Sequence, residues 1–193
     1  ALGHDRATWI GYSMGGRTAL QVAVHRPEAV SALVLEGATA GLEGAERASR
    51  IESDEALADR IDRDGVETFI DYWQAVPLFA TQSSLPEETR ASIRAGRLEN
   101  RAVGLANSLR GMGAGTQEPV HDRLSRVLTP VLLVAGTLDE KFSAIAGELQ
   151  QVLPTSAVNL IDGAGHAAHI ERPSQFAEAV LTFLRRVHPG AGR

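Results

Sequence analysis

The chain has 193 residues, of which 44% are hydrophobic and 22% are charged, a composition typical of a globular domain rather than a disordered or fibrous protein. Its net charge of −5 gives no general attraction to polyanions, which argues against nucleic acid or an acidic membrane surface as a partner and favours a small molecule. It has no Cys, and no apolar run approaches the roughly 20 residues that a membrane-spanning helix needs. We therefore expect a cytoplasmic protein; the sequence carries no signal for its oligomeric state.

The first residues predict a strand, a sharp turn and a helix. Residues 7–10 are a short run of β type that ends at a glycine-rich turn. Residues 13–25 then repeat small and apolar side chains at helical spacing until Pro27. Residues 30–35 are continuously apolar, as in a buried parallel strand. A sheet that began at residue 7 would leave an apolar edge unpaired, so we expect further strands upstream of this chain.

After Gly37 the strand signal disappears. It is replaced by Arg- and Glu-rich helical segments, which are broken at Pro77, Pro86 and the glycine cluster at 111–115. This pattern predicts a helical cap over residues 38–127, inserted between strands.

The strand and helix pattern resumes near the end of the chain. Residues 131–135 and 158–161 are apolar runs of strand length, and residues 142–153 and 173–186 have helical spacing. Strands that alternate with helices indicate a parallel α/β sheet. We therefore divide the chain into residues 1–37 and 128–193, which form the sheet core, and the cap between them.

A candidate nucleophile lies in the turn Gly11-Tyr12-Ser13-Met14-Gly15. A Gly-x-Ser-x-Gly turn between a strand and a helix presents the serine hydroxyl at the end of the sheet, and small neighbours let the strand and helix pass closely. The N–H of Met14, at the start of the helix, is placed to donate to a developing oxyanion.

The partners of such a serine follow in the order acid and then histidine, each just past a later strand, in the α/β-hydrolase fold. Asp139 and His166 have these positions, although Asp139 alone could be a helix N-cap and His166 an ordinary loop histidine. Among the other five histidines, His169 is a candidate neighbour of this triad. No metal-ligand spacing and no phosphate-binding Gly-Lys-Ser/Thr loop is present, so we expect neither a metal nor a cofactor.

Longer motifs carry a resemblance to a known family. The first is the segment from Gly11 to Arg17, which contains the serine turn and is called the nucleophile elbow. The others are Leu35-Glu36-Gly37-Ala38 after the second strand, the cap segments 77–80 and 104–113, and Asp139-Glu140-Lys141-Phe142. Together they resemble the 2-succinyl-6-hydroxy-2,4-cyclohexadiene-1-carboxylate (SHCHC) synthases of menaquinone biosynthesis, which are lyases with the α/β-hydrolase fold. The likeness extends to about Arg186, whereas the amino-terminal half of the family's sheet is not in this chain.

The resemblance implies a reaction and a set of binding residues. Ser13, activated through His166, would act as a general base that removes a ring proton, after which pyruvate is expelled. The substrate is a polycarboxylate, and arginines suit carboxylates because they bind them in a bidentate manner. The implied binding residues are Tyr12, Arg17, Arg50, Trp73, Arg97 and Lys141.

Two other functions remain open from the sequence. A serine hydrolase acting on an ester or a C–C bond would use the same triad but form a tetrahedral or acyl intermediate. A truncated fold without activity would only associate with a partner through its open sheet edge. Arginines that converge on the pocket favour the lyase, because a hydrolase of neutral esters has little use for them.

Overall fold

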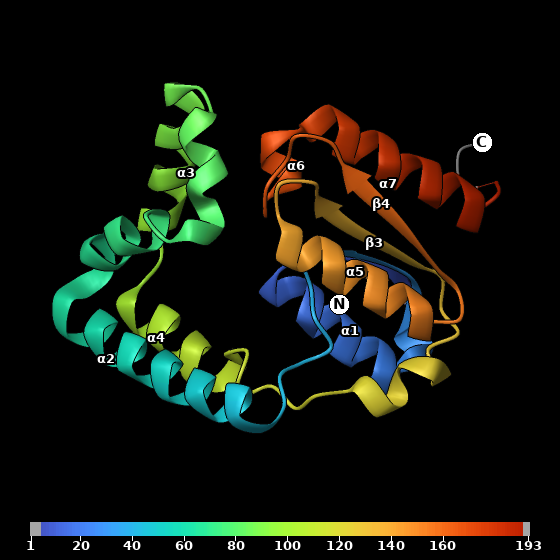
Figure 1. Ribbon diagram of the computed structural model, residues 1–193, viewed down its shortest axis with the longest axis horizontal. Helices are drawn as coiled ribbons and strands as arrows, with labels where there is room; N and C mark the ends of the chain where they lie inside the picture. The colour runs from blue at the N-terminus through green and yellow to red at the C-terminus, as the bar shows by residue number, and fades with distance from the viewer. Residues whose placement is uncertain (1–4, 191–193) are drawn as a thin grey trace. The chain divides into compact units, whose positions relative to one another are not determined.

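The computed structural model describes residues 5–190 of the chain, which falls into two compact units (Figure 1). The sheet unit comprises Ala1–Ala40 and Val120–Arg193, and the helical unit comprises Gly41–Pro119. The helical unit is thus a continuous insertion between the second and third strands.

The sheet unit contains four parallel strands in the order β1-β2-β3-β4, which is also their order along the chain. They are β1 (Ala7–Tyr12), β2 (Val30–Glu36), β3 (Val131–Gly136) and β4 (Ser156–Ile161). Their helices are α1 (Met14–His25), α5 (Glu140–Val152), α6 (Ala168–Glu171) and α7 (Pro173–Val187), with short 3-10 helices η1 (Pro27–Ala29) and η3 (His121–Arg126). The predicted parallel α/β arrangement is confirmed.

Side chains along the central strands point alternately to the two faces of the sheet and so contribute to two separate hydrophobic cores. Leu33 and Leu35 of β2 pack with α1, α5 and η3 on one face of the sheet. Ala32 and Val34 pack with residues of α6 and α7. The ribbon shows these two helices on the opposite face of the sheet from α1 and α5 (Figure 1). β2 and β3 are therefore buried on both faces, as their continuously apolar sequences predict.

The strand β1 is more exposed than β2 or β3. It is an edge strand of the described sheet, with Trp9 37% and Ile10 55% exposed. The expectation of further strands upstream concerns residues outside this chain and stays a prediction.

The helical unit consists of three helices and a 3-10 segment. They are α2 (Gly44–Gln74), η2 (Pro77–Ser84), α3 (Glu87–Leu98) and α4 (Ala102–Met112). The helix α2 contains a break at Gly65, whose φ of 82° is not helical. The core of the helical unit joins α2 to α4 through Ala58, Ile61, Phe69, Ile70 and Ala106.

Charged side chains add a second connection between α2 and α4. Arg110 of α4 lies 2.7 to 2.8 Å from the carboxylates of Glu55, Asp59 and Asp62, which are on successive turns of α2. Because the Arg110 guanidinium binds three carboxylates at once, this network stabilises the contact between α2 and α4 more than an isolated surface ion pair would.

The breaks predicted at prolines and glycines occur where the sequence places them: η2 begins at Pro77, Pro86 precedes α3, and Gly113 ends α4. The helical unit, however, ends at Pro119 and not at residue 127. The reason is that Val120, Leu124 and Val127 pack into the core of the sheet unit. The described part of the chain contains no helix with the length and apolarity to cross a membrane.

Candidate active site

The candidate site lies at the carboxyl ends of the parallel strands, which is where open α/β sheets bind their ligands. Ser13 follows β1, Glu36 ends β2, Asp139 follows β3, and His166 lies in the loop after β4. Parallel pairing brings these four ends to the same edge of the sheet. Residues that are up to 153 positions apart in sequence are thereby brought into contact.

Ser13 has the strained backbone that a nucleophile elbow requires. Its φ is 50° and its ψ is −110°, and it is the one residue other than glycine with a positive φ among residues 5–190. The turn is closed by the hydrogen bond that its backbone N–H donates to the Glu36 carbonyl at 2.7 Å. A Cβ at Gly11 would overlap the backbone of Gly15, and one at Gly16 would lie 2.8 Å from the Ala38 Cβ. Glycine at both positions therefore permits the close approach of strand and helix.

Ser13, His166 and Asp139 form a continuous hydrogen-bonded chain. Nδ1 of His166 lies 2.8 Å from Oδ2 of Asp139, and Nε2 of His166 lies 3.1 Å from Oγ of Ser13. A carboxylate can only accept, so Nδ1–H donates to Asp139 and leaves Nε2 as the acceptor for the serine hydroxyl. This tautomer is the one that can take a proton from Ser13.

Asp139 makes both of the contacts that its sequence position suggested as alternatives. Its Oδ1 accepts a hydrogen bond from the Phe142 backbone N–H at 3.1 Å and so caps α5, while Oδ2 faces His166. The carboxylate is 9% exposed. One buried side chain therefore connects the start of α5 to the imidazole.

The His166 ring is enclosed by other side chains and by a glycine. The rings of Phe142 and Tyr12 lie 4.5 Å and 5.2 Å from it, measured between ring centroids. Gly37, whose φ is +56°, also lies against the ring: a Cβ there would be 2.7 Å from Cε1 of His166. The His166 side chain is 1% exposed, so its orientation is fixed by packing.

We expect Gly37→Ala to reduce turnover of a nitrophenyl ester by about 10²-fold, because the new methyl group would displace the His166 ring and small misplacements are costly. Gly44→Ala is the matched control: Gly44 has a similar φ of +53° but no atom near its would-be Cβ. Both variants should lose similar stability in thermal unfolding. Equal activities of the two variants would contradict the role assigned to Gly37.

The loop that carries His166 is held by a buried glutamate that the sequence analysis missed. Glu171, 7% exposed, accepts hydrogen bonds from the backbone N–H groups of Gly165 at 2.7 Å and Ala167 at 3.3 Å. These two residues flank His166. The available signal was an acidic residue five positions after the histidine, in a segment otherwise rich in small residues.

Two other predicted site residues lie on α1, next to Ser13. Met14 is its first residue, so its backbone N–H is one of those that the helix itself does not use. Arg17 is one turn further on and is 9% exposed, which is uncommon for an arginine. Lys141 is exposed in the first turn of α5, two residues after Asp139. Roles for all three in binding or oxyanion stabilisation stay predictions.

The remaining predicted binding residues belong to the helical unit. Within it, Trp73 and Arg97 both contact Phe79: the two aromatic rings are 5.6 Å apart, and the Arg97 guanidinium is 5.2 Å from the centre of the Phe79 ring. Arg50 instead binds Asp54, one turn along α2, with 2.8 Å between Nε and Oδ1. The structure thus brings two of these three residues together.

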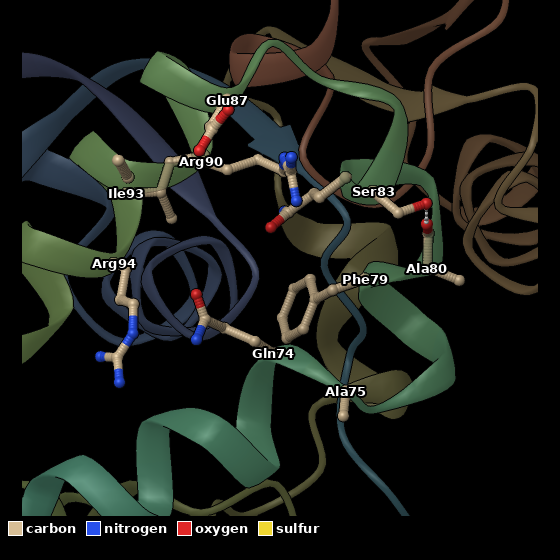
Figure 2. Close-up of a pocket in the computed structure, with 11 residues that line it drawn as sticks. Gln74, Ala75, Phe79, Ala80, Ser83, Glu87, Arg90, Ile93 and Arg94 are labelled. Carbon is tan, nitrogen blue, oxygen red and sulfur yellow. Dashed lines mark hydrogen bonds between the residues drawn. The ribbon is translucent and has the colours of Figure 1, made fainter.

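A cavity of about 650 Å³ lies within the helical unit, between the end of α2, η2 and α3 (Figure 2). Gln74, Phe79, Arg90 and Arg94 are among the residues around it. Arg94 binds Asp71 at 2.8 Å and Glu67 at 3.3 Å, so it connects α3 to α2. None of the triad residues lines this cavity, and we do not assign it to the chemistry of Ser13.

Among residues 5–190, no group of three or more His, Cys, Asp or Glu side chains could hold a metal ion. The expectation that the protein needs neither a metal nor a cofactor was drawn from the sequence and stays a prediction.

Comparisons with known proteins agree with this geometry. The family described as alpha/beta hydrolase fold matches residues 1–173. An SHCHC synthase of Serratia proteamaculans (strain 568) is 30% identical over 190 residues, which cover 97% of this chain and 71% of that protein. A Bacillus subtilis (strain 168) protein, provisionally given the same name, is 49% identical over 179 residues.

The Bacillus alignment covers 92% of this chain but only 65% of the relative, so the chain spans slightly less than two thirds of that protein. The solved structure of MenH from S. aureus superposes with a TM-score of 0.92 at 36% identity, covering 94% of this chain and 69% of that one. The chain therefore belongs to the α/β-hydrolase-fold family and, within it, to the SHCHC synthases.

Proposed function

We propose that the protein eliminates pyruvate from the enolpyruvyl-succinyl-hydroxy-cyclohexene-carboxylate precursor and so forms SHCHC in menaquinone biosynthesis. The observation that carries the proposal is the hydrogen-bonded chain from Ser13 through His166 to Asp139, found in a member of this family. The acceptor at Nε2 supports the use of Ser13 as a general base.

In this reaction His166 takes the hydroxyl proton of Ser13, and the serine oxygen takes the proton from the ring carbon. The electron pair of the broken C–H bond forms the ring double bond, and the C–O bond to the enolpyruvyl group breaks. The leaving group accepts the proton from His166 and is released as pyruvate, so no water is consumed and no acyl-enzyme forms. A positioned base of this kind contributes roughly 10²- to 10⁴-fold to the rate.

We propose that the substrate carboxylates are held by arginines. Arg17 is the best supported, because it lies one turn from Ser13 along α1, is 9% exposed, and carries a guanidinium, which binds carboxylates in a bidentate manner. On the family resemblance alone, we also assign substrate contacts to Arg50, Arg97, Tyr12 and Trp73. Lys141 would act near Asp139, and the Met14 N–H would donate to developing negative charge. We propose a small polycarboxylate as partner and a cytoplasmic location; the net charge of −5 argues only against nucleic acid.

We expect Arg17→Ala to lower kcat/KM for the precursor by about 10- to 150-fold, since a hydrogen bond to a charged group contributes roughly 1.5 to 3 kcal/mol. Turnover of nitrophenyl acetate should change far less, because this ester has no carboxylate. Arg185→Ala, at an exposed position of α7, is the control. Equal losses on both substrates would instead indicate a distorted α1 and would favour the hydrolase alternative.

The experiment that tests the proposed function is a comparison of kcat/KM for the enolpyruvyl precursor and for a panel of neutral esters. The lyase should prefer the precursor by several orders of magnitude. A preference for esters, with hydrolysis of the precursor or no reaction on it, would support a serine hydrolase.

A further inference from the structure

A second carboxylate and imidazole lie together beside the triad. Glu36 is 2% exposed at the end of β2, and its Oε1 accepts a hydrogen bond from the His169 backbone N–H at 3.1 Å. Its Oε2 is 2.8 Å from Nδ1 of His169, an ion-pair distance without the alignment of a full hydrogen bond. A carboxylate buried this deeply needs such partners, because desolvation without them is costly.

The ring of Tyr12 lies between this pair and the triad. Its centroid is 4.7 Å from that of His169, in an edge-on arrangement, and 5.2 Å from that of His166. His169 is also packed edge-on against Phe176 of α7, with 5.9 Å between centroids. A continuous series of contacts therefore leads from Glu36 through His169 and Tyr12 to the imidazole that receives the Ser13 proton.

We propose that Glu36 and His169 are positioning residues for proton transfer: Glu36 fixes the His169 ring, which holds Tyr12 against His166. A displaced His166 ring would lose its 3.1 Å contact between Nε2 and Oγ of Ser13, and Tyr12 packs against this ring. Tyr12 thus contacts the His166 ring in addition to Phe142 and Gly37, which also lie against it. The inference rests on the triad as the working base and not on the identity of the substrate.

The first test uses the rate at which a fluorophosphonate labels Ser13, together with kcat and KM for nitrophenyl acetate. His169→Ala should lower the labelling rate and kcat by about 10²-fold with KM unchanged, as expected for a misplaced base. His169→Asn should lose as much, because an amide can still donate to Glu36 but offers Tyr12 no ring. His25→Ala, at an exposed position of α1, should label at the wild-type rate. Wild-type labelling of both His169 variants would overturn the proposal.

The second test separates position from charge. Glu36→Ala should be as impaired as His169→Ala. Glu36→Gln should restore most activity, because its amide oxygen accepts from the His169 N–H and its amide nitrogen can donate to Nδ1 of the other tautomer. Its pH profile should match that of the wild type. A Gln variant as slow as Ala, or one with a shifted pH profile, would show that the charge of Glu36 acts instead and would contradict positioning.

The failure of the proposed reaction can be distinguished from the failure of this inference. A wild-type protein that labels at Ser13 but releases no pyruvate would contradict the proposed reaction. The labelling rates of the variants relative to wild type could still be measured.

Discussion

Ser13→Ala and His166→Ala should each remove nearly all pyruvate release, with losses of about 10²- to 10⁴-fold or more, because each removes one end of a single proton-transfer pair. The remaining side chain has no partner with which to act: the Ser13 hydroxyl is a weak base alone, and in the proposed reaction the imidazole acts on the ring proton only through the serine oxygen. Neither change should unfold the protein, because Ser13 is held by backbone hydrogen bonds and the His166 loop by Glu171.

The double variant is the decisive member of this set. If the two residues act as a unit, Ser13→Ala together with His166→Ala should be no slower than the worse single variant. The measurement is single-turnover pyruvate formation by all four proteins, with circular dichroism to verify folding. Losses that add in log rate would mean independent roles and would refute the triad assignment.

Asp139→Asn should lower turnover by about 10³- to 10⁴-fold while leaving thermal stability nearly unchanged. The amide can still accept the Phe142 N–H and cap α5, but it no longer stabilises the Nδ1–H tautomer of His166 or the imidazolium that forms. Asp139→Ala should lose similar activity and in addition about 1 kcal/mol of stability, since it also loses the cap.

The two variants therefore separate the two carboxylate oxygens of Asp139. Unfolding midpoints in urea and ester turnover, measured on the same preparations, provide the comparison. If Asn retained wild-type turnover, Asp139 would be a helix cap only, which is the alternative its sequence position allowed.

Much of the sheet unit could be predicted because its signals are local. β2 and β3 are continuous apolar runs, and the elbow motif lies between a strand and a helix, so the pattern predicts the alternation of strands and helices and the candidate positions of Ser13, Asp139 and His166. The hydrogen bonds between them depend on parallel pairing, which brings the strand ends to one edge.

The supporting residues could not be predicted, because their roles arise only in the folded chain. Glu36 and Glu171 read as ordinary charges in the sequence, yet each is buried and binds backbone N–H groups near the site. The true limit of the helical unit was also hidden, since Val120 and Leu124 show no strand pattern but pack into the sheet core. For Glu36 the sequence shows a charged residue at the end of an otherwise apolar strand, but nothing in it indicates the contact with His169.

The most direct measurement of the central claim is the stoichiometry of a single turnover with the enolpyruvyl precursor. Pyruvate and the cyclohexadiene product are quantified at the same time points, and the mass of the intact protein is recorded. Elimination by Ser13 as a base predicts equal amounts of both products, formed at the same rate, and a protein of unchanged mass. Pyruvate without the diene, or a substrate fragment bound to Ser13, would contradict the account and indicate covalent hydrolase chemistry.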